Sequence, residues 1–164
     1  VPYNQSIARP PIQELAMKLL RKPRSERRRG AALVEMALVL PVFLSVVLGI
    51  IEFGRAMMIS NLLANASREG ARLAVMTGTT NGEVSSAVTD FLNQAAGISA
   101  GDVNVTITVT AAPGNPDPGN NVANAQKRDL CSVHVTLPFD KVSLIPSDHL
   151  TGVSLVGHSA MRHE

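Results

Sequence analysis

The sequence predicts an α+β protein: a long amino-terminal transmembrane helix continues into an amphipathic helix, and a small antiparallel sheet of about three strands follows. Residues 31–53 are almost wholly apolar, as a membrane span requires. Apolar side chains then recur every three or four positions over residues 59–74, which is the helical period. The strand candidates, which alternate apolar and polar side chains, are residues 103–109, residues 131–137 and, less regularly, residues 153–160.

The apolar run has the length of a membrane span. From Ala31 to Ile51 it has 21 residues, and at about 1.5 Å per residue a helix of this length crosses the roughly 30 Å of bilayer hydrocarbon. A cleaved signal peptide is the alternative. Such a peptide needs small residues after its apolar core, whereas Arg55, Met57 and Met58 follow here. We therefore expect a retained, single-pass span.

Charge is distributed unevenly about this span. Residues 1–30 carry eight Lys and Arg against two Glu, whereas residues 31–164 carry seven basic and eleven acidic residues. Because positive charge stays on the cytoplasmic side, we expect residues 1–30 to be a basic cytoplasmic leader and the part after the helix to be exported. Arg27, Arg28 and Arg29 would set this topology. The basic run lacks interleaved aromatic residues, so we expect no nucleic-acid partner.

The second half of the helix, up to about residue 76, carries small residues at a spacing of four. Ala66, Gly70 and Ala74 form a row that allows another element to approach closely, so we interpret them as helix-packing residues. Gly54 weakens the helix, and a bend is expected near it.

Residues 77–164 are expected to form a small exported α+β domain. Turn chemistry over residues 77–82 precedes a short amphipathic helix that ends near Gly97, and the strands follow. Residues 112–128, rich in Pro, Gly and Asn, are expected to be a flexible loop. The single cysteine, Cys131, lies on the apolar face of a strand and is interpreted as a core residue.

The sequence carries no pattern typical of catalysis. It has no nucleophile elbow, no phosphate-cradling glycine loop and no CxxC. The four histidines lack metal-ligand spacing, and the neighbours Asp148 and His149 are interpreted as surface residues. We therefore expect no enzymatic activity, no metal and no cofactor.

Glu35 is the costly residue of the span. A carboxylate at the centre of a bilayer costs about 2.5–3.5 kcal/mol on insertion scales, and less near an end. In one interpretation, Glu35 lies near the cytoplasmic interface and has no role. The other pairs it with a cation, which a cut between Gly30 and Ala31 would supply as a new amino terminus. Between subunits, such a pair would set the axial register of neighbouring helices.

Several segments of the chain form a specific combination. They are Gly30-Ala31-Ala32-Leu33-Val34-Glu35, Leu40-Pro41, Gly49-Ile50-Ile51-Glu52-Phe53-Gly54-Arg55, Ala66 and Arg68-Glu69-Gly70-Ala71-Arg72-Leu73-Ala74. Together they resemble the TadE-like family, over about residues 28–76. The resemblance implies a pilin-like fold and a minor pilin or pseudopilin of the Tad/Flp type IV pilus machinery in the bacterial inner membrane. It implies cleavage by a prepilin peptidase between Gly30 and Ala31, and contacts with other pilins or pseudopilins and with pilus assembly platform proteins.

Two residues depart from the prepilin pattern. Met36 follows the glutamate where prepilins of this pilus class favour an aromatic residue, and Ala31 stands where type IV pilins commonly have Phe. The alternative function is therefore an uncleaved, membrane-anchored exported binding module of the cell envelope. Whether the protein enters the filament or stays at its base is open at this point.

Overall fold

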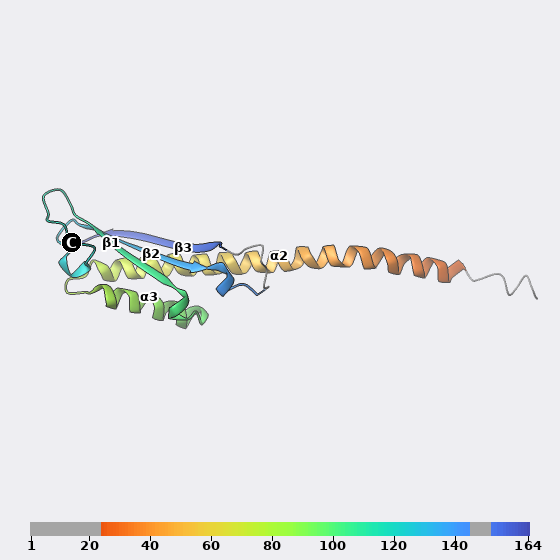
Figure 1. The fold of residues 1–164 in the computed structure, drawn as a ribbon. Coiled ribbons are helices and arrows are strands. Elements are labelled where there is room, and N and C mark those ends of the chain that lie inside the picture. Colours follow the sequence, from red (N-terminus) through yellow and green to blue (C-terminus); the bar gives the residue numbers. More distant parts are fainter. Residues whose placement is uncertain (1–23, 145–151) are drawn as a thin grey trace, which may run out of the picture. The chain divides into compact units, whose positions relative to one another are not determined.

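The computed structural model describes residues 24–144 and 152–164, with side chains from Gly30 onward (Figure 1). The α+β prediction is confirmed, and residues 1–23 of the predicted leader lie outside the described residues. The helices are α2 (Arg24–Ala74) and α3 (Asn81–Ala96), the strands are β1 (Asn104–Thr110), β2 (Leu130–Pro138) and β3 (Ser154–Arg162), and the 3-10 turns are η1 (Ala100–Asp102), η2 (Val122–Asn124) and η3 (Phe139–Lys141).

Helix α2 has 51 residues and contains Pro41. It begins before the predicted start at residue 31 and ends two residues before residue 76, and it runs through Gly54 without an interruption in its helical assignment. The chain divides into two compact units, Val1–Val47 and Leu48–Glu164, so α2 contributes to both. The second unit, here called the α+β unit, starts inside the helix. The domain boundary expected at residue 77 stays a prediction.

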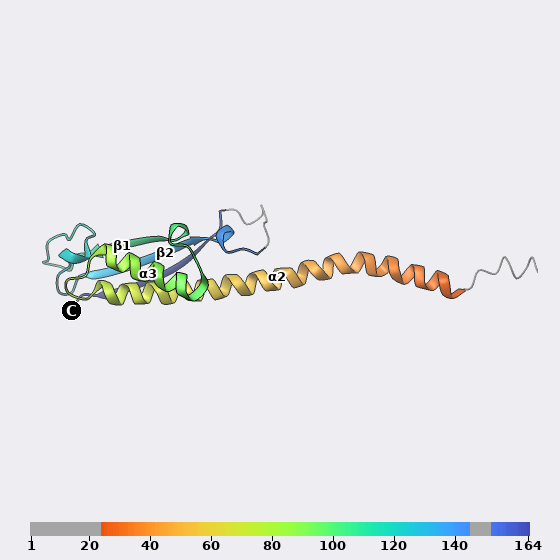
Figure 2. The same ribbon diagram turned by 90° about the horizontal axis from the view of Figure 1, so that it is seen from below.

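In the α+β unit, the second half of α2 and helix α3 pack on one face of a three-stranded antiparallel sheet (Figures 1 and 2). The strand order is β1-β2-β3, so β2 is central. Its inward side chains have no exposed surface, which explains the predicted alternation. These inward residues are Cys131, Val133, Val135 and Leu137, and their partners on β1 are Val109, Ile107 and Val105 for the first three.

Helix α3 is defined by both of its ends. Thr80 accepts a hydrogen bond from the Glu83 backbone N–H, and the Glu83 carboxylate accepts one from the Thr80 N–H at 2.8 Å, forming a capping box. Gly97 ends the helix in the left-handed conformation, with φ of 66°. The apolar face between these caps buries Val84, Val88 and Leu92 in the core.

Two glycines allow the backbones to approach closely inside this core. A Cβ at Gly70 of α2 would lie 2.7 Å from Val88 Cγ2 of α3. A Cβ at Gly157 of β3 would lie 2.3 Å from the carbonyl oxygen of Leu63 on α2. The glycine that made the third strand irregular as a sequence pattern is thus the point where β3 crosses the helix.

The segment 112–128 is joined to the rest of the unit by hydrogen bonds. It contains η2, whose Val122 is buried, and the Asn81 side chain at the start of α3 accepts from the Val122 N–H at 2.8 Å. The buried Asp129 carboxylate accepts from the Ala112 N–H at 2.8 Å, from the Asn115 side chain at 2.7 Å and from the Gln126 N–H at 2.7 Å. The flexibility expected for this loop stays a prediction.

Gly157→Ala should destabilise the α+β unit, because the added methyl meets main-chain atoms of α2 that cannot rotate away. Overpacking costs about 1–3 kcal/mol, and we expect the top of that range. The matched control is Gly101→Ala, whose Cβ would have no neighbour within 4 Å. Hydrogen–deuterium exchange of the β2 amides in detergent-solubilised full chain measures the loss. Equal protection in both variants would contradict the close crossing.

Asp129→Asn should lower the thermal stability of the full chain at neutral pH, because an amide NH₂ would face the N–H donors. These donors, the Ala112 and Gln126 N–H first and the Asn115 amide next, hold the pKa of Asp129 below its usual value. The stabilisation is therefore complete above the ordinary pKa of about 3.9 and is lost as the pH falls through the lower folded-state pKa.

The melting temperatures of Asp129→Asn and the unmodified chain should accordingly differ at pH 7 and converge on acidification. The control is Asp90→Asn, an exposed carboxylate on α3. If the difference in melting temperature between Asp129→Asn and the unmodified chain does not change with pH, this account is contradicted.

Candidate functional site

The first half of α2 exposes apolar side chains that no other described residue covers. Every side chain from residue 30 to residue 46 is exposed; that of Leu38, for example, is 72% exposed. Among the described residues, one helix, Gly30–Ala74, is long and apolar enough to cross a membrane. An apolar surface this large needs lipid or a protein partner, and this helix suggests membrane anchoring.

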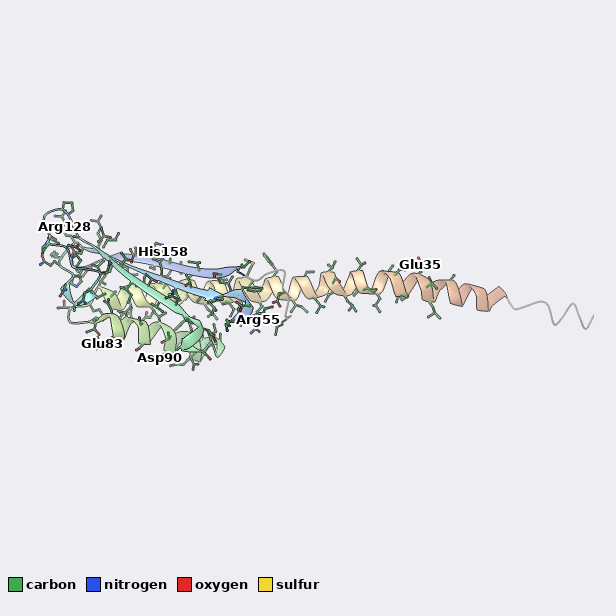
Figure 3. The ribbon with its side chains drawn as sticks, in the orientation of Figure 1. Glu35, Arg55, Glu83, Asp90, Arg128 and His158 are labelled. Carbon is green, nitrogen blue, oxygen red and sulfur yellow. The ribbon has the colours of Figure 1, made fainter. Side chains whose placement is uncertain are left out.

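The residues predicted for cleavage, register and topology lie at the start of this helix. Gly30, Ala31 and Glu35 are exposed, and the Glu35 side chain projects from α2 (Figure 3). The backbone of residues 27–29 belongs to the same helix, while the side chains of Arg27, Arg28 and Arg29 lie outside the described part. Their roles stay predictions.

The small-residue row occupies a different setting. Ala66, Gly70 and Ala74 are buried inside the α+β unit. Gly70 faces Val88 on α3 and Val133 on β2, at 2.7 and 3.3 Å from the position of an added Cβ. In this structure the row therefore serves packing within the chain. The elements that approach it are helix α3 and the sheet.

The structure also brings together two charged residues to which the sequence analysis gave no role. Glu52 is 9% exposed, and its carboxylate accepts hydrogen bonds from the Ser143 hydroxyl and from the Leu144 N–H at 3.2 and 3.3 Å. The guanidinium of Arg55, one turn further along α2, donates to the Val142 carbonyl (Figure 3). Two side chains of the helix thus hold the segment that follows η3.

The sequence contained part of the evidence for a role of Glu52 and Arg55. Glu52 and Arg55 are three residues apart, so they share a helix face, and each interrupts an otherwise apolar region. Their partners lie about 90 residues later, in a segment without periodicity, so the sequence could show the unusual charges but not what they bind.

The remaining chemistry-bearing residues form no reactive constellation in the described part of the chain. Cys131 is a free, buried cysteine, and burial raises the pKa of its thiol, which suits the predicted core role. His134 and His158 are opposite each other on β2 and β3, with stacked rings whose centroids are 4.1 Å apart. Among the described residues no group of three or more His, Cys, Asp or Glu could hold a metal ion. Asp148 and His149 lie outside them.

Comparison with known proteins identifies the amino-terminal part of the chain. Residues 30–72 match the model of the TadE-like protein family, as the resemblance in the sequence had suggested. No curated protein and no solved structure matches the chain. The TadE-like segment supports a protein associated with the Tad pilus in general, from a family that is structural rather than enzymatic.

Proposed function

We propose that this protein is a minor pilin-like, or pseudopilin, structural component in the assembly of a Tad/Flp-type IV pilus or a related secretion apparatus. The observation that carries the proposal is the extent of the TadE-like match. Residues 30–72 take in the exposed apolar helix and the part of α2 that packs under the sheet, and they end two residues before α2 ends. The matched segment is thus an anchor joined to a folded unit by one helix.

The proposed location is a single-pass position in the bacterial inner membrane, with the amino terminus cytoplasmic and the α+β unit exported. The charge asymmetry supports it, because Arg27, Arg28 and Arg29 immediately precede the apolar helix. The proposed partners are a prepilin peptidase, other pilins or pseudopilins and the assembly platform proteins. An uncleaved, membrane-anchored binding module is the second candidate, and the departures at Ala31 and Met36 favour it.

Cleavage after Gly30 decides between these two functions. Co-expression with a prepilin peptidase of a Tad system should yield a membrane-purified chain that begins at Ala31, measured as intact mass. Gly30→Val should abolish this cleavage, whereas Gly49→Val, at another exposed glycine of α2 with no neighbour within 4 Å of an added Cβ, should leave it intact. A chain that keeps residues 1–30 in the presence of active peptidase would support the anchored module instead.

Loss of the Glu35 charge should impair assembly but spare insertion. A carboxylate that pairs with the amino terminus of a neighbouring subunit is needed for register, whereas a neutral side chain enters the membrane more easily. We expect Glu35→Gln to fractionate with membranes and to lose crosslinks to partner pilins, and Glu35→Asp, which keeps the charge, to retain part of them. Normal crosslinking and normal filaments from Glu35→Gln would remove the register role.

A further inference from the structure

The segment Val142–Leu144, here called the junction loop, has its backbone polar groups unusually well paired. The Val142 and Ser143 N–H groups donate to the Phe139 carbonyl at 3.0 and 2.9 Å. The Leu144 N–H donates to Glu52, and the Val142 carbonyl accepts from Arg55. Unpaired backbone polar groups are costly in lipid, so this pairing lowers the cost of placing the loop next to the membrane.

Apolar side chains are exposed both on the junction loop and on the stretch of α2 that it contacts. Leu144 is 58% exposed, and on α2 the side chains of Ile51, Phe53, Met57 and Met58 are 49, 67, 54 and 51% exposed. Exposed apolar side chains concentrated in one region mark an interaction surface.

One exposed face of α2 shows where this surface ends. At a spacing of four residues, Phe53 and Met57 are followed on the same face by Asn61 and Asn65, and all four are exposed. The face therefore changes from apolar to polar between residues 57 and 61. The Leu144 N–H donates a hydrogen bond to Glu52. Glu52 precedes Met57 by five residues, or about 8 Å of helix. The junction loop is thus on the apolar side of the change.

The length of the span is compatible with this boundary. A helix needs about 20 residues to cross the hydrocarbon, so a span that begins between Ala31 and Glu35 ends between about residues 51 and 56. Glu52 would then lie at the hydrocarbon boundary, where the junction loop provides the Glu52 carboxylate with hydrogen-bond donors.

We propose that the junction loop and the exposed apolar side chains of α2 from Ile51 to Met58 are immersed in the membrane–water interface, with Leu144 inserted among lipid chains. The lipid bilayer is the occupant because the surface is continuous with the exposed apolar helix along α2. The α+β unit would thus be seated on the membrane by a second contact besides its helix. This inference rests on the membrane span of the proposed function.

The chain contains no tryptophan, so single Leu→Trp variants of the full chain report depth directly. Leu144→Trp tests the junction loop, Leu44→Trp tests the span, and Leu130→Trp, at the opposite end of β2, is the matched control. Leu130 is 36% exposed, and eight strand residues place it about 26 Å from Pro138. Each is reconstituted in phosphatidylcholine–phosphatidylglycerol vesicles that contain lipid brominated either just below the headgroups or near the bilayer centre.

We expect Trp emission from Leu144→Trp to shift to shorter wavelength and to be quenched most by the shallow bromine. Emission from Leu44→Trp should be quenched most by the deep bromine, and that from Leu130→Trp only by iodide in the buffer. Adding Glu52→Ala to Leu144→Trp should release the loop and reduce its quenching by lipid, with protection of the β2 amides showing that the sheet remains folded.

The outcomes distinguish the membrane span of the proposed function from the interfacial position of the junction loop. If neither brominated lipid quenches the Trp emission of Leu44→Trp, the membrane span itself is overturned. If brominated lipid quenches the emission of Leu44→Trp but iodide quenches that of Leu144→Trp, the span stands and the interfacial position of the junction loop is overturned. A short-wavelength emission of Leu144→Trp that no brominated lipid quenches would place a protein there instead of lipid, and would also overturn the proposal.

Discussion

The close approach of helix α2 to the sheet is the contact on which the α+β unit depends. The unit has few aromatic residues with which to fill space, so its core is made of Val, Leu, Ile and Ala at short distances. Such a core gains burial only if the backbones come together. Gly157 lets β3 cross the main chain at Leu63, and Gly70 lets α3 and β2 reach the same helix. The part of α2 that belongs to the α+β unit begins at Leu48, within the same helix as the exposed apolar residues before it.

The junction itself depends on polar rather than apolar contacts. Glu52 and Arg55 lie one turn apart on α2 and bind opposite polarities of one backbone segment: the carboxylate accepts an N–H and the guanidinium donates to a carbonyl. Each charged group is thereby hydrogen-bonded to the backbone of the junction loop. A buried carboxylate with hydrogen-bond donors is tolerated, whereas an unpaired one is costly. The arrangement therefore explains how two ionisable residues can interrupt an apolar helix.

Local patterns predicted much of this molecule. The alternation around Val133 and Val135, the helical repeat of α2, the turn before α3 and the stop near Gly97 each follow from residues close in sequence. At the candidate site, the residues close in sequence around Gly30 and Glu35 suggested roles that stay predictions. The Glu52 contacts, the Asp129 network and the crossing at Gly157 join residues far apart along the chain, and periodicity carries no information about such partners. The segment from Leu48 to Ala74 was likewise predicted as helix, but nothing local showed that a compact unit begins inside it.

The outer face of the sheet has a consequence for how such a protein can evolve. Thr106, His134 and His158 lie side by side across the three strands, on the face away from α2 and α3. Exposed substitutions that disturb no packing change stability little. Substitutions can therefore change the chemistry of this face at little cost in stability, whereas changes at the close contacts of Gly70 and Gly157 beneath it would disturb the packing.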